Sequence, residues 1–273
     1  MKNQQLDFKN NTGFTLVEMA IVLVILGFVL AALLLPLQAQ RNQLFQTQTE
    51  NTLEIAKKAL LGYAQSNGRL PCPATALNNT DAGSLGQENP LGGTRNITPP
   101  VAVPNCSTYA GYLPAVTLGL QPTDGSGFAI DAWNNRIRYA ITSNNNSAAI
   151  VTGALCGGDT APDFTTAGNM SAVGLACLAP NLRVVCGTIT TSDCTAGTNL
   201  TNNAVAVIFS TGKNFGQSAG VDETSNLSAA ATTFYSRTPT AATAAPSNEF
   251  DDMVIWISPF VLYNAMIQAG QLH

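Results

Sequence analysis

Two short motifs match patterns that surround catalytic serines. Gly216–Gly220 reads G-Q-S-A-G, the form of a nucleophile elbow, and Ser210–Lys213 has the S-x-x-K form. An elbow requires a following helix and a histidine base, yet Val221–Asn226 is a poor helix sequence and the one histidine is the terminal His273. The S-x-x-K match lacks the S-D-N and K-T-G motifs that accompany it. We therefore predict a protein that is not an enzyme and has no catalytic residue.

Glu18 is the one charged residue of a long apolar segment, Phe14–Leu37. Within it, Met19–Leu35 has no polar side chain, and a helix of about 20 apolar residues spans the hydrocarbon core of a bilayer. The segment is longer than the core of a signal peptide. Lys2 and Lys9 precede it, so the positive-inside rule keeps the first residues cytoplasmic and places the remainder outside. A carboxylate at this depth is costly without a partner, which favours a functional role over a glutamate that only reaches the interface.

The cysteines follow the apolar segment and therefore lie on the predicted outer side, where disulfides persist. They are Cys72, Cys106, Cys156, Cys177, Cys186 and Cys194. No two have the C-x-x-C spacing of a zinc ribbon or of a thioredoxin-like site. Their even number suits three bridges, for which many pairings are possible. The sequential set is Cys72–Cys106, Cys156–Cys177 and Cys186–Cys194, and free buried thiols are the alternative.

The composition excludes several classes of function. The chain has 273 residues, of which 45% are hydrophobic and only 10% are charged, and its formal net charge is -4. Without a basic excess, nucleic-acid binding is not expected as the main activity. The hydrophobic content argues against a disordered chain.

The N-terminal segment resembles that of a known family. Gly13–Met19 reads G-F-T-L-V-E-M before an unbroken apolar run, which is similar to the N-terminus of type IV prepilins and type II secretion pseudopilins. In that family a membrane peptidase cuts after the glycine, the new N-terminal phenylalanine is N-methylated, and a glutamate five places into the mature chain guides assembly. The resemblance implies that Gly13 precedes the cut, that Phe14 becomes the methylated N-terminus, and that Glu18 is the assembly carboxylate. It covers only about the first 40 residues.

The apolar segment is expected to continue as an amphipathic helix. Leu53, Ala56, Leu60 and Tyr63 recur at spacings of three and four, which predicts one buried face, and Asn67–Gly68 is a helix-end signal. The predicted parts are a cleaved leader at 1–13, a transmembrane or filament-core half of the helix at 14–37, an amphipathic half at 38–66 and an extracytoplasmic β-rich domain at 67–273.

The last of these parts has short apolar runs separated by Thr, Ser, Asn and Gly, which predicts strands and long loops. The candidate strands are 137–142, 148–152, 182–185, 204–210 and 253–258. We expect an irregular loop at 78–104 and exposed stretches at 199–203 and 229–248. Ser258 followed by proline predicts the start of a C-terminal helix. The predicted fold class is α+β and pilin-like, with a long N-terminal α-helix packed on an antiparallel β-sheet domain with long loops.

Two further segments resemble parts of major pseudopilins. Asp131–Tyr139 is similar to their D-x-W-G-N-x-x-x-Y segment, with Asn134 in place of glycine, and asparagine also tolerates positive φ. Glu249, Asp251 and Asp252 precede an apolar stretch with a tryptophan, as in the acidic C-terminal region of those proteins, where calcium can bind. The resemblance implies a calcium site at these carboxylates, with a solvated loop as the alternative, and no other cofactor is expected.

The resemblance also implies a structural role. The chain would be cut by the prepilin peptidase and would cross the inner membrane once, with its N-terminus cytoplasmic and its C-terminal domain periplasmic. It would then polymerise with other pilin or pseudopilin subunits at an inner-membrane assembly platform. The favoured hypothesis is a component of a type II secretion pseudopilus. The alternatives are a minor type IV pilin for adhesion, filament priming or DNA uptake, and a membrane-anchored binding protein or enzyme that never polymerises.

Overall fold

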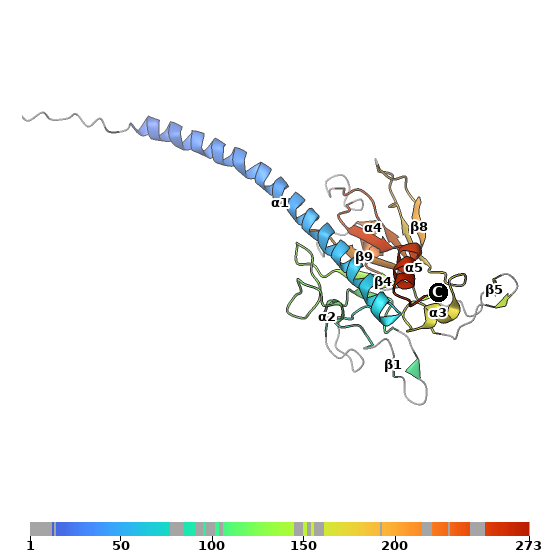
Figure 1. Ribbon diagram of the computed structural model, residues 1–273. Helices are drawn as coiled ribbons and strands as arrows, with labels where there is room; N and C mark the ends of the chain where they lie inside the picture. The colour runs from blue at the N-terminus through green and yellow to red at the C-terminus, as the bar shows by residue number, and fades with distance from the viewer. Residues whose placement is uncertain are drawn as a thin grey trace, which may run out of the picture. The chain divides into compact units, whose positions relative to one another are not determined.

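The computed structural model of the chain divides into two compact units, Met1–Gln46 and Thr47–His273. The residues that it describes are 13, 15–76, 85–90, 95–96, 102–103, 106–144, 150–151, 154–155, 161–191, 193–214, 220–228, 230–240 and 249–272. Among these, side chains are not described at 32–39, 95–96, 102–103, 150–151 and 154–155. Figure 1 labels the helices and strands.

Helix α1 (Leu16–Asn67) runs without interruption through the predicted apolar and amphipathic halves. It ends at the expected signal, because Gly68 has a φ of +66° and its amide donates to the carbonyl of Ala64 at 2.9 Å. Glycine adopts this left-handed conformation without a steric penalty from a Cβ atom. The end of the helix is therefore encoded locally.

One stripe of the C-terminal half of α1 is buried. Leu53, Ala56, Leu60 and Ala64 each expose 1% or less of their surface. The prediction is right for the first three, but Tyr63 is only half-buried and Ala64 continues the stripe. The phenol of Tyr63 lies at the rim, where its hydroxyl group makes polar contacts.

The main sheet has four antiparallel strands in the order β11-β9-β4-β3. They are β3 (Ala110–Tyr112), β4 (Arg138–Ile141), β9 (Ala206–Ser210) and β11 (Met253–Ile257). Ile208 of β9 lies opposite Ile255 of β11 on one side and Tyr139 of β4 on the other. Three of these strands fall within predicted segments. The fourth, β3, is three residues long and contains Gly111, which leaves too little alternation for a signal.

A second sheet has three strands in the order β10-β7-β8. They are β7 (Leu182–Val185), β8 (Asn199–Ala204) and β10 (Thr233–Tyr235). The bounds of β7 agree with the prediction, and β7 pairs parallel with β10 and antiparallel with β8. Residues 199–203 are exposed or half-buried as expected, but the expectation did not foresee that they form a strand, and it missed β10, in which Phe234 is buried. Ala204 is the only fully buried residue of β8, so the polar sequence of this edge strand carries no apolar alternation.

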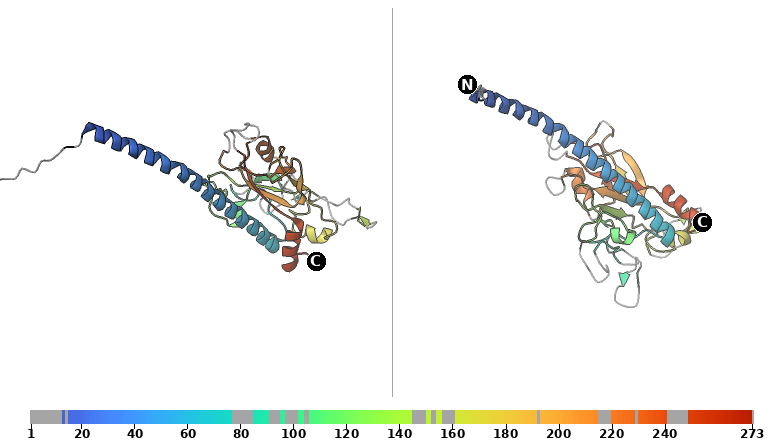
Figure 2. Two further views of the ribbon diagram at one scale, coloured as in Figure 1. Left: turned by 90° about the horizontal axis from the view of Figure 1, so that it is seen from above. Right: turned by 60° about the vertical axis from the view of Figure 1, so that its left-hand side comes forward.

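Both faces of the main sheet are covered. Helix α1 and the C-terminal helix α5 (Pro259–Gln268) lie on one face, and the second sheet lies on the other (Figure 2). The core on the helix side includes Leu53, Leu60, Tyr139, Ile208, Ile257 and Leu262. The core between the sheets includes Ala140, Val184, Val207, Phe209 and Phe234. Successive residues of a strand point to opposite faces. A sheet with two buried faces therefore needs continuous apolar strands, and β9 is buried at every position.

Short elements occupy the connections. They are α2 (Ala115–Leu118), α3 (Asn169–Val173), a ribbon of β1 (Arg95–Asn96) with β2 (Ala102–Val103), and a ribbon of β5 (Ile150–Val151) with β6 (Ala154–Leu155). The predicted loop at 78–104, the predicted strand at 148–152 and the predicted exposed stretch at 229–248 lie partly outside the described residues.

Two helices follow β9. The first, α4 (Val221–Asn226), shows that the expectation of a poor helix was wrong. The carboxylate of Glu223 accepts a hydrogen bond from the amide of Gly220 at 2.9 Å, which satisfies one donor at the helix start. The second, α5, begins as predicted, with the hydroxyl of Ser258 accepting from the amide of Val261 and a proline in the first turn.

Candidate functional site

The predicted processing site is partly described. Gly13 is exposed, and a Cβ atom added there would meet nothing within 4 Å. Phe14 and residues 1–12 lie outside the described residues. The folded chain therefore gives no packing reason for a glycine at position 13.

Glu18 folds back on Thr15 at the start of α1. One carboxylate oxygen of Glu18 accepts hydrogen bonds from the amide and from the hydroxyl of Thr15, each at 2.8 Å. In return, the amide of Glu18 donates to the Thr15 hydroxyl at 3.3 Å. This T-x-x-E arrangement is a capping box, which satisfies amides that a helix start leaves free. A partner from another chain would compete with this local contact for the Glu18 carboxylate.

The residues around and after Glu18 expose a continuous apolar surface. Between 49% and 86% of the surface is exposed for Leu16, Val17, Met19, Ile21, Val22, Leu23, Val24, Ile25, Leu26, Phe28, Val29 and Leu30. Exposed apolar patches of this extent mark sites of contact with a membrane or with another protein. Over the residues that the structure describes, no helix is both long enough and apolar enough to cross a membrane.

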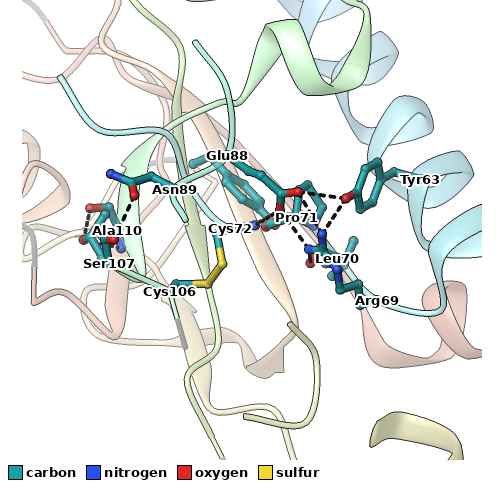
Figure 3. Close-up of a disulfide and its surroundings, with 12 residues drawn as sticks. Tyr63, Arg69, Leu70, Pro71, Cys72, Glu88, Asn89, Cys106, Ser107 and Ala110 are labelled. Carbon is teal, nitrogen blue, oxygen red and sulfur yellow. Dashed lines mark hydrogen bonds and ion pairs between the residues drawn. A yellow bond between two sulfur atoms is a disulfide. The ribbon is translucent and has the colours of Figure 1, made fainter. Parts of the chain in front are cut away.

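At the other end of α1, a buried ion pair holds the helix to the sheet domain (Figure 3). Arg69 and Glu88 expose only 7% and 3% of their side chains and form a two-pronged pair, with both N–O distances 2.8 Å. The hydroxyl of Tyr63 donates to Glu88 at 3.0 Å and accepts from Arg69 at 2.8 Å. The amide of Cys72 donates to the same carboxylate at 3.2 Å. Both charges are thus bonded, which a buried pair requires.

The protonation of Tyr63 supports this arrangement. Burial and the neighbouring Glu88 carboxylate raise the pKa of Tyr63 to about 12. The phenol therefore stays protonated at neutral pH and remains a donor to Glu88. Sequence periodicity assigned Tyr63 to the apolar face and gave no sign of this polar network.

Two of the expected disulfides are present, Cys72–Cys106 and Cys186–Cys194. The first joins residues 34 apart and lies beside the buried ion pair (Figure 3), and the second joins residues eight apart. Cys177 is also disulfide-bonded, and Cys156 lies outside the described residues. Because a disulfide restricts the unfolded chain more when its loop is longer, the first bridge contributes more to stability than the second.

The D-x-W-N-N-x-x-x-Y segment builds a turn and part of the core. Asp131 accepts hydrogen bonds from two amides of its own turn at 2.8 Å and from the hydroxyl of Ser210 at 2.5 Å. Asn134 has a φ of +66°, a conformation for which glycine is usual. The buried hydroxyl of Tyr139 donates to the carbonyl of Pro71 at 3.1 Å. The segment therefore has a structural role.

The S-x-x-K motif, which the structure describes, acquires no catalytic geometry. In the S-x-x-K motif, Ser210 is buried and donates to Asp131, and the backbone amide of Lys213 donates to Asp251 at 2.8 Å. Ser218 of the G-x-S-x-G motif and His273 lie outside the described residues. Ser210 thus serves the fold.

The predicted calcium ligands are only partly brought together. Carboxylate oxygens of Asp251, Asp252 and Glu223 lie within 4.8 Å of one another, and Glu249 is not in this group. Glu223 also accepts a hydrogen bond from the amide of Asp251 at 2.7 Å. The sequence gave no signal for Glu223, because its contact with Asp251 joins positions 28 residues apart in the chain. We call Glu223, Asp251 and Asp252 the acidic cluster.

Two carboxyl groups of the acidic cluster have raised pKa values. Burial, together with the charge of Glu223, raises the pKa of Asp251 to about 7 and that of Asp252 to about 8. One oxygen of Asp251 and one of Glu249 are buried without a hydrogen-bond partner in the described part of the chain. Close, buried carboxylates need either protons or a cation to balance their charge. Carboxylate and carbonyl oxygens are the ligands that calcium takes.

Comparison with known proteins bears on the N-terminal segment alone. Residues 8–34 match the family described as the prokaryotic N-terminal methylation motif. The matched range contains Gly13, Phe14, Glu18 and the exposed apolar stretch that follows. No curated protein and no solved structure is significantly similar to the chain.

Proposed function

The prepilin-type methylation motif at residues 8–34 supports a type IV pilin-like or pseudopilin-like protein, and from this premise we propose that the chain is a structural filament subunit of a type II secretion system. The motif is the observation that carries the proposal. It implies cleavage by the prepilin peptidase and assembly with other pilin-type subunits. A structural subunit of this kind is usually not an enzyme.

Two features of the folded chain support a filament subunit. The first part of α1 exposes apolar side chains that need an apolar environment, and the sheet domain encloses its own core beneath disulfides and a buried ion pair. In the proposal, the first part of α1 is inserted in the inner membrane before assembly and lies in the filament core afterwards. The sheet domain then faces the periplasm and coats the filament.

Cleavage after Gly13 would free a charged amino group at Phe14. In an apolar filament core, this amino group needs an anion, and Glu18 of a neighbouring subunit supplies one, which leaves neither charge buried and unpaired. Glu18 must leave its contact with Thr15 to do so. We propose that the Glu18 carboxylate exchanges its contact with Thr15 for the amino group of the neighbouring subunit. This new contact would set the position of each incoming subunit in the filament.

Substitution of Glu18 tests this proposal. We expect chains with Glu18→Ala to be cut normally and to be absent from sheared filaments, since cleavage does not need the carboxylate and registration does. Glu50→Ala removes an exposed glutamate elsewhere on α1 and serves as the matched control. Normal entry of processed Glu18→Ala chains into filaments would contradict the proposed role.

A minor type IV pilin is the second candidate function, and a membrane-anchored protein that never polymerises is the third. Immunogold labelling of sheared filaments separates the three. Dense label along the filament indicates a major subunit. Sparse label, or label at the tip, indicates a minor subunit, and absence of label indicates an anchored protein. The genes that neighbour this one separate secretion from pilus biogenesis.

We also propose that the acidic cluster binds calcium, with Glu223 in the place expected for Glu249. The support is the mutual distance of the three carboxylates and the burial of two of them, Glu223 and Asp252. Calorimetric titration of the full chain in detergent with calcium chloride tests it, with Asp252→Asn as the matched variant. Absence of binding at millimolar calcium would remove the proposal without affecting the filament role.

A further inference from the structure

A groove runs beside the C-terminal half of α1. It has a volume of about 330 Å³ and lies between α1, the edge strand β11 and the start of α5. The residues that line it from β11 and the start of α5 are Val254, Ile255, Trp256, Ser258 and Val261. From α1, Glu54 and Lys57 complete the lining. We call this the β11 groove.

The β11 groove has the chemistry of a protein contact. Ile255, which packs against the core on the helix side, is only partly buried, and Val261 is 44% exposed. Among the described strands, β11 has no neighbour on its outer side, so its edge is open to a second molecule.

Glu54 is free to change its partner. It pairs with Lys57 one turn away at 3.8 Å, and 52% of the Glu54 side chain and 26% of the Lys57 side chain are exposed. Exposed pairs of this kind contribute little to stability. An arginine from another molecule can therefore replace Lys57 at small cost.

A complementary surface lies further toward the N-terminus of α1. Arg41 stacks on the ring of Phe45 at 5.2 Å and has no ion-pair partner in the part of the chain that the structure describes. Leu44, on the same turn, is 54% exposed. The Arg41–Phe45 turn therefore presents a cation and an apolar side chain to a second molecule.

We propose that the β11 groove is the docking site for a second copy of this chain, whose Arg41–Phe45 turn fills it. Arg41 of one copy pairs with Glu54 of the next, and Leu44 contacts Ile255 and Val261. The charges are complementary, and the spacing of Arg41 and Glu54 corresponds to an axial offset of about 20 Å between parallel copies. Because the two surfaces are different parts of the chain, the contact is head-to-tail and can repeat from copy to copy, as a filament requires.

The inference rests on the proposed function, since it needs parallel α1 helices packed side by side. Charge pairs across such a contact fix the register and the choice of partner more than they add affinity. Reversal of one charge should therefore block assembly by repulsion, and reversal of both should restore it. Copies of the double variant still present opposite charges to each other.

The first experiment is a charge exchange in the full chain, read out as the amount of subunit in sheared filaments. We expect Arg41→Glu and Glu54→Arg each to cause a loss of filaments, and the double variant to recover them. Lys58→Glu reverses an exposed charge on the outward side of α1 and should assemble as the unaltered chain does. Single variants that assemble normally, or a double variant no better than either single one, would overturn the proposal.

The second experiment traps the contact. The described native cysteines are all in disulfides, so an introduced pair reports its own proximity. Chains with both Leu44→Cys and Val261→Cys should form a ladder of multimers on a non-reducing gel, and Lys58→Cys with Val261→Cys should not. If the unaltered chain forms no filament, the proposed function itself fails. If filaments form without the ladder, only the assignment of the groove fails.

Discussion

The two units of the molecule use apolar side chains in opposite ways, although α1 runs through both. In Met1–Gln46, Leu26 is 49% exposed and Phe28 is 74% exposed. In Thr47–His273, Leu60 of the same helix is completely buried beneath the sheet. The second unit buries an apolar core within its own chain, and the first exposes its apolar side chains. Folding and assembly should therefore respond to different substitutions.

The largest effect is expected at Gly13, in the first unit. Gly13→Leu should leave the chain uncut and abolish filaments, because the prepilin motif requires a glycine before the cut and the structure has open space at this position. The sheet domain should unfold at an unchanged temperature. Gly62→Ala alters another glycine with open space around it and should be cut normally. If the Gly13→Leu chain migrated on a gel at the mass expected after removal of residues 1–13, the prediction would be contradicted.

The largest effect on folding is expected from the buried ion pair of the second unit. Arg69→Leu leaves the Glu88 carboxylate buried without its partner, which should cost about 3–5 kcal/mol of unfolding free energy. Thermal unfolding of the full chain in detergent measures it. Replacement of both charges, Arg69→Met with Glu88→Leu, should cost less than the single change, since no uncompensated charge remains. Equal losses in the single and double variants would contradict this account.

A smaller difference is expected between two leucines of α1. Leu60→Ala should destabilise the sheet domain by about 2–5 kcal/mol, because it leaves a cavity in the core. Leu26→Ala should leave the unfolding temperature unchanged and should reduce filament yield. If Leu26→Ala lowered the unfolding temperature as much as Leu60→Ala, the separation of folding from assembly would be wrong.

The smallest expected effect is a dependence on pH and calcium in the acidic cluster. The folded-state pKa values of Asp251 and Asp252 are raised to about 7 and about 8, whereas the ordinary pKa of an aspartate is about 4. The folded chain thus holds these protons more tightly than the unfolded chain. Without calcium, this contribution to stability is full below about pH 4 and falls as the pH rises to about 8.

Calcium should act in the opposite direction, because it binds the ionised carboxylates of the folded state. We expect calcium chloride to raise the unfolding temperature more at about pH 8 than at about pH 5. Asp252→Asn should weaken both the pH dependence and the calcium effect. Equal effects of calcium at the two pH values would argue against a site in this cluster.

Much of this molecule could be predicted from local sequence signals. The glycine after Asn67 ends α1, Ser258 starts α5, and the apolar run at Leu182–Val185 gives a strand with the expected bounds. Each of these features depends on neighbouring residues only. The positive φ of Asn134 is also a local property, because asparagine adopts this backbone conformation more readily than most other residues.

What could not be predicted depends on contacts between distant parts of the chain. The polar edge strand Asn199–Ala204 exists because Leu182–Val185 pairs with it. Glu223 enters the acidic cluster through α4, a helix that its own sequence does not favour. Arg69 and Glu88 are charged residues in a buried position, which no apolar periodicity reveals. The N-terminal motif needs no such contact, because it is a linear segment, and residues 8–34 match the methylation motif as a sequence.

The most direct measurement of the central claim is mass spectrometry of the N-terminal peptide from sheared filaments. We predict a peptide that begins at Phe14 and carries one methyl group on its amino nitrogen, recovered together with peptides of the sheet domain. A chain that still begins before Gly13, or that is found in the membrane and never in the filament fraction, would contradict the account.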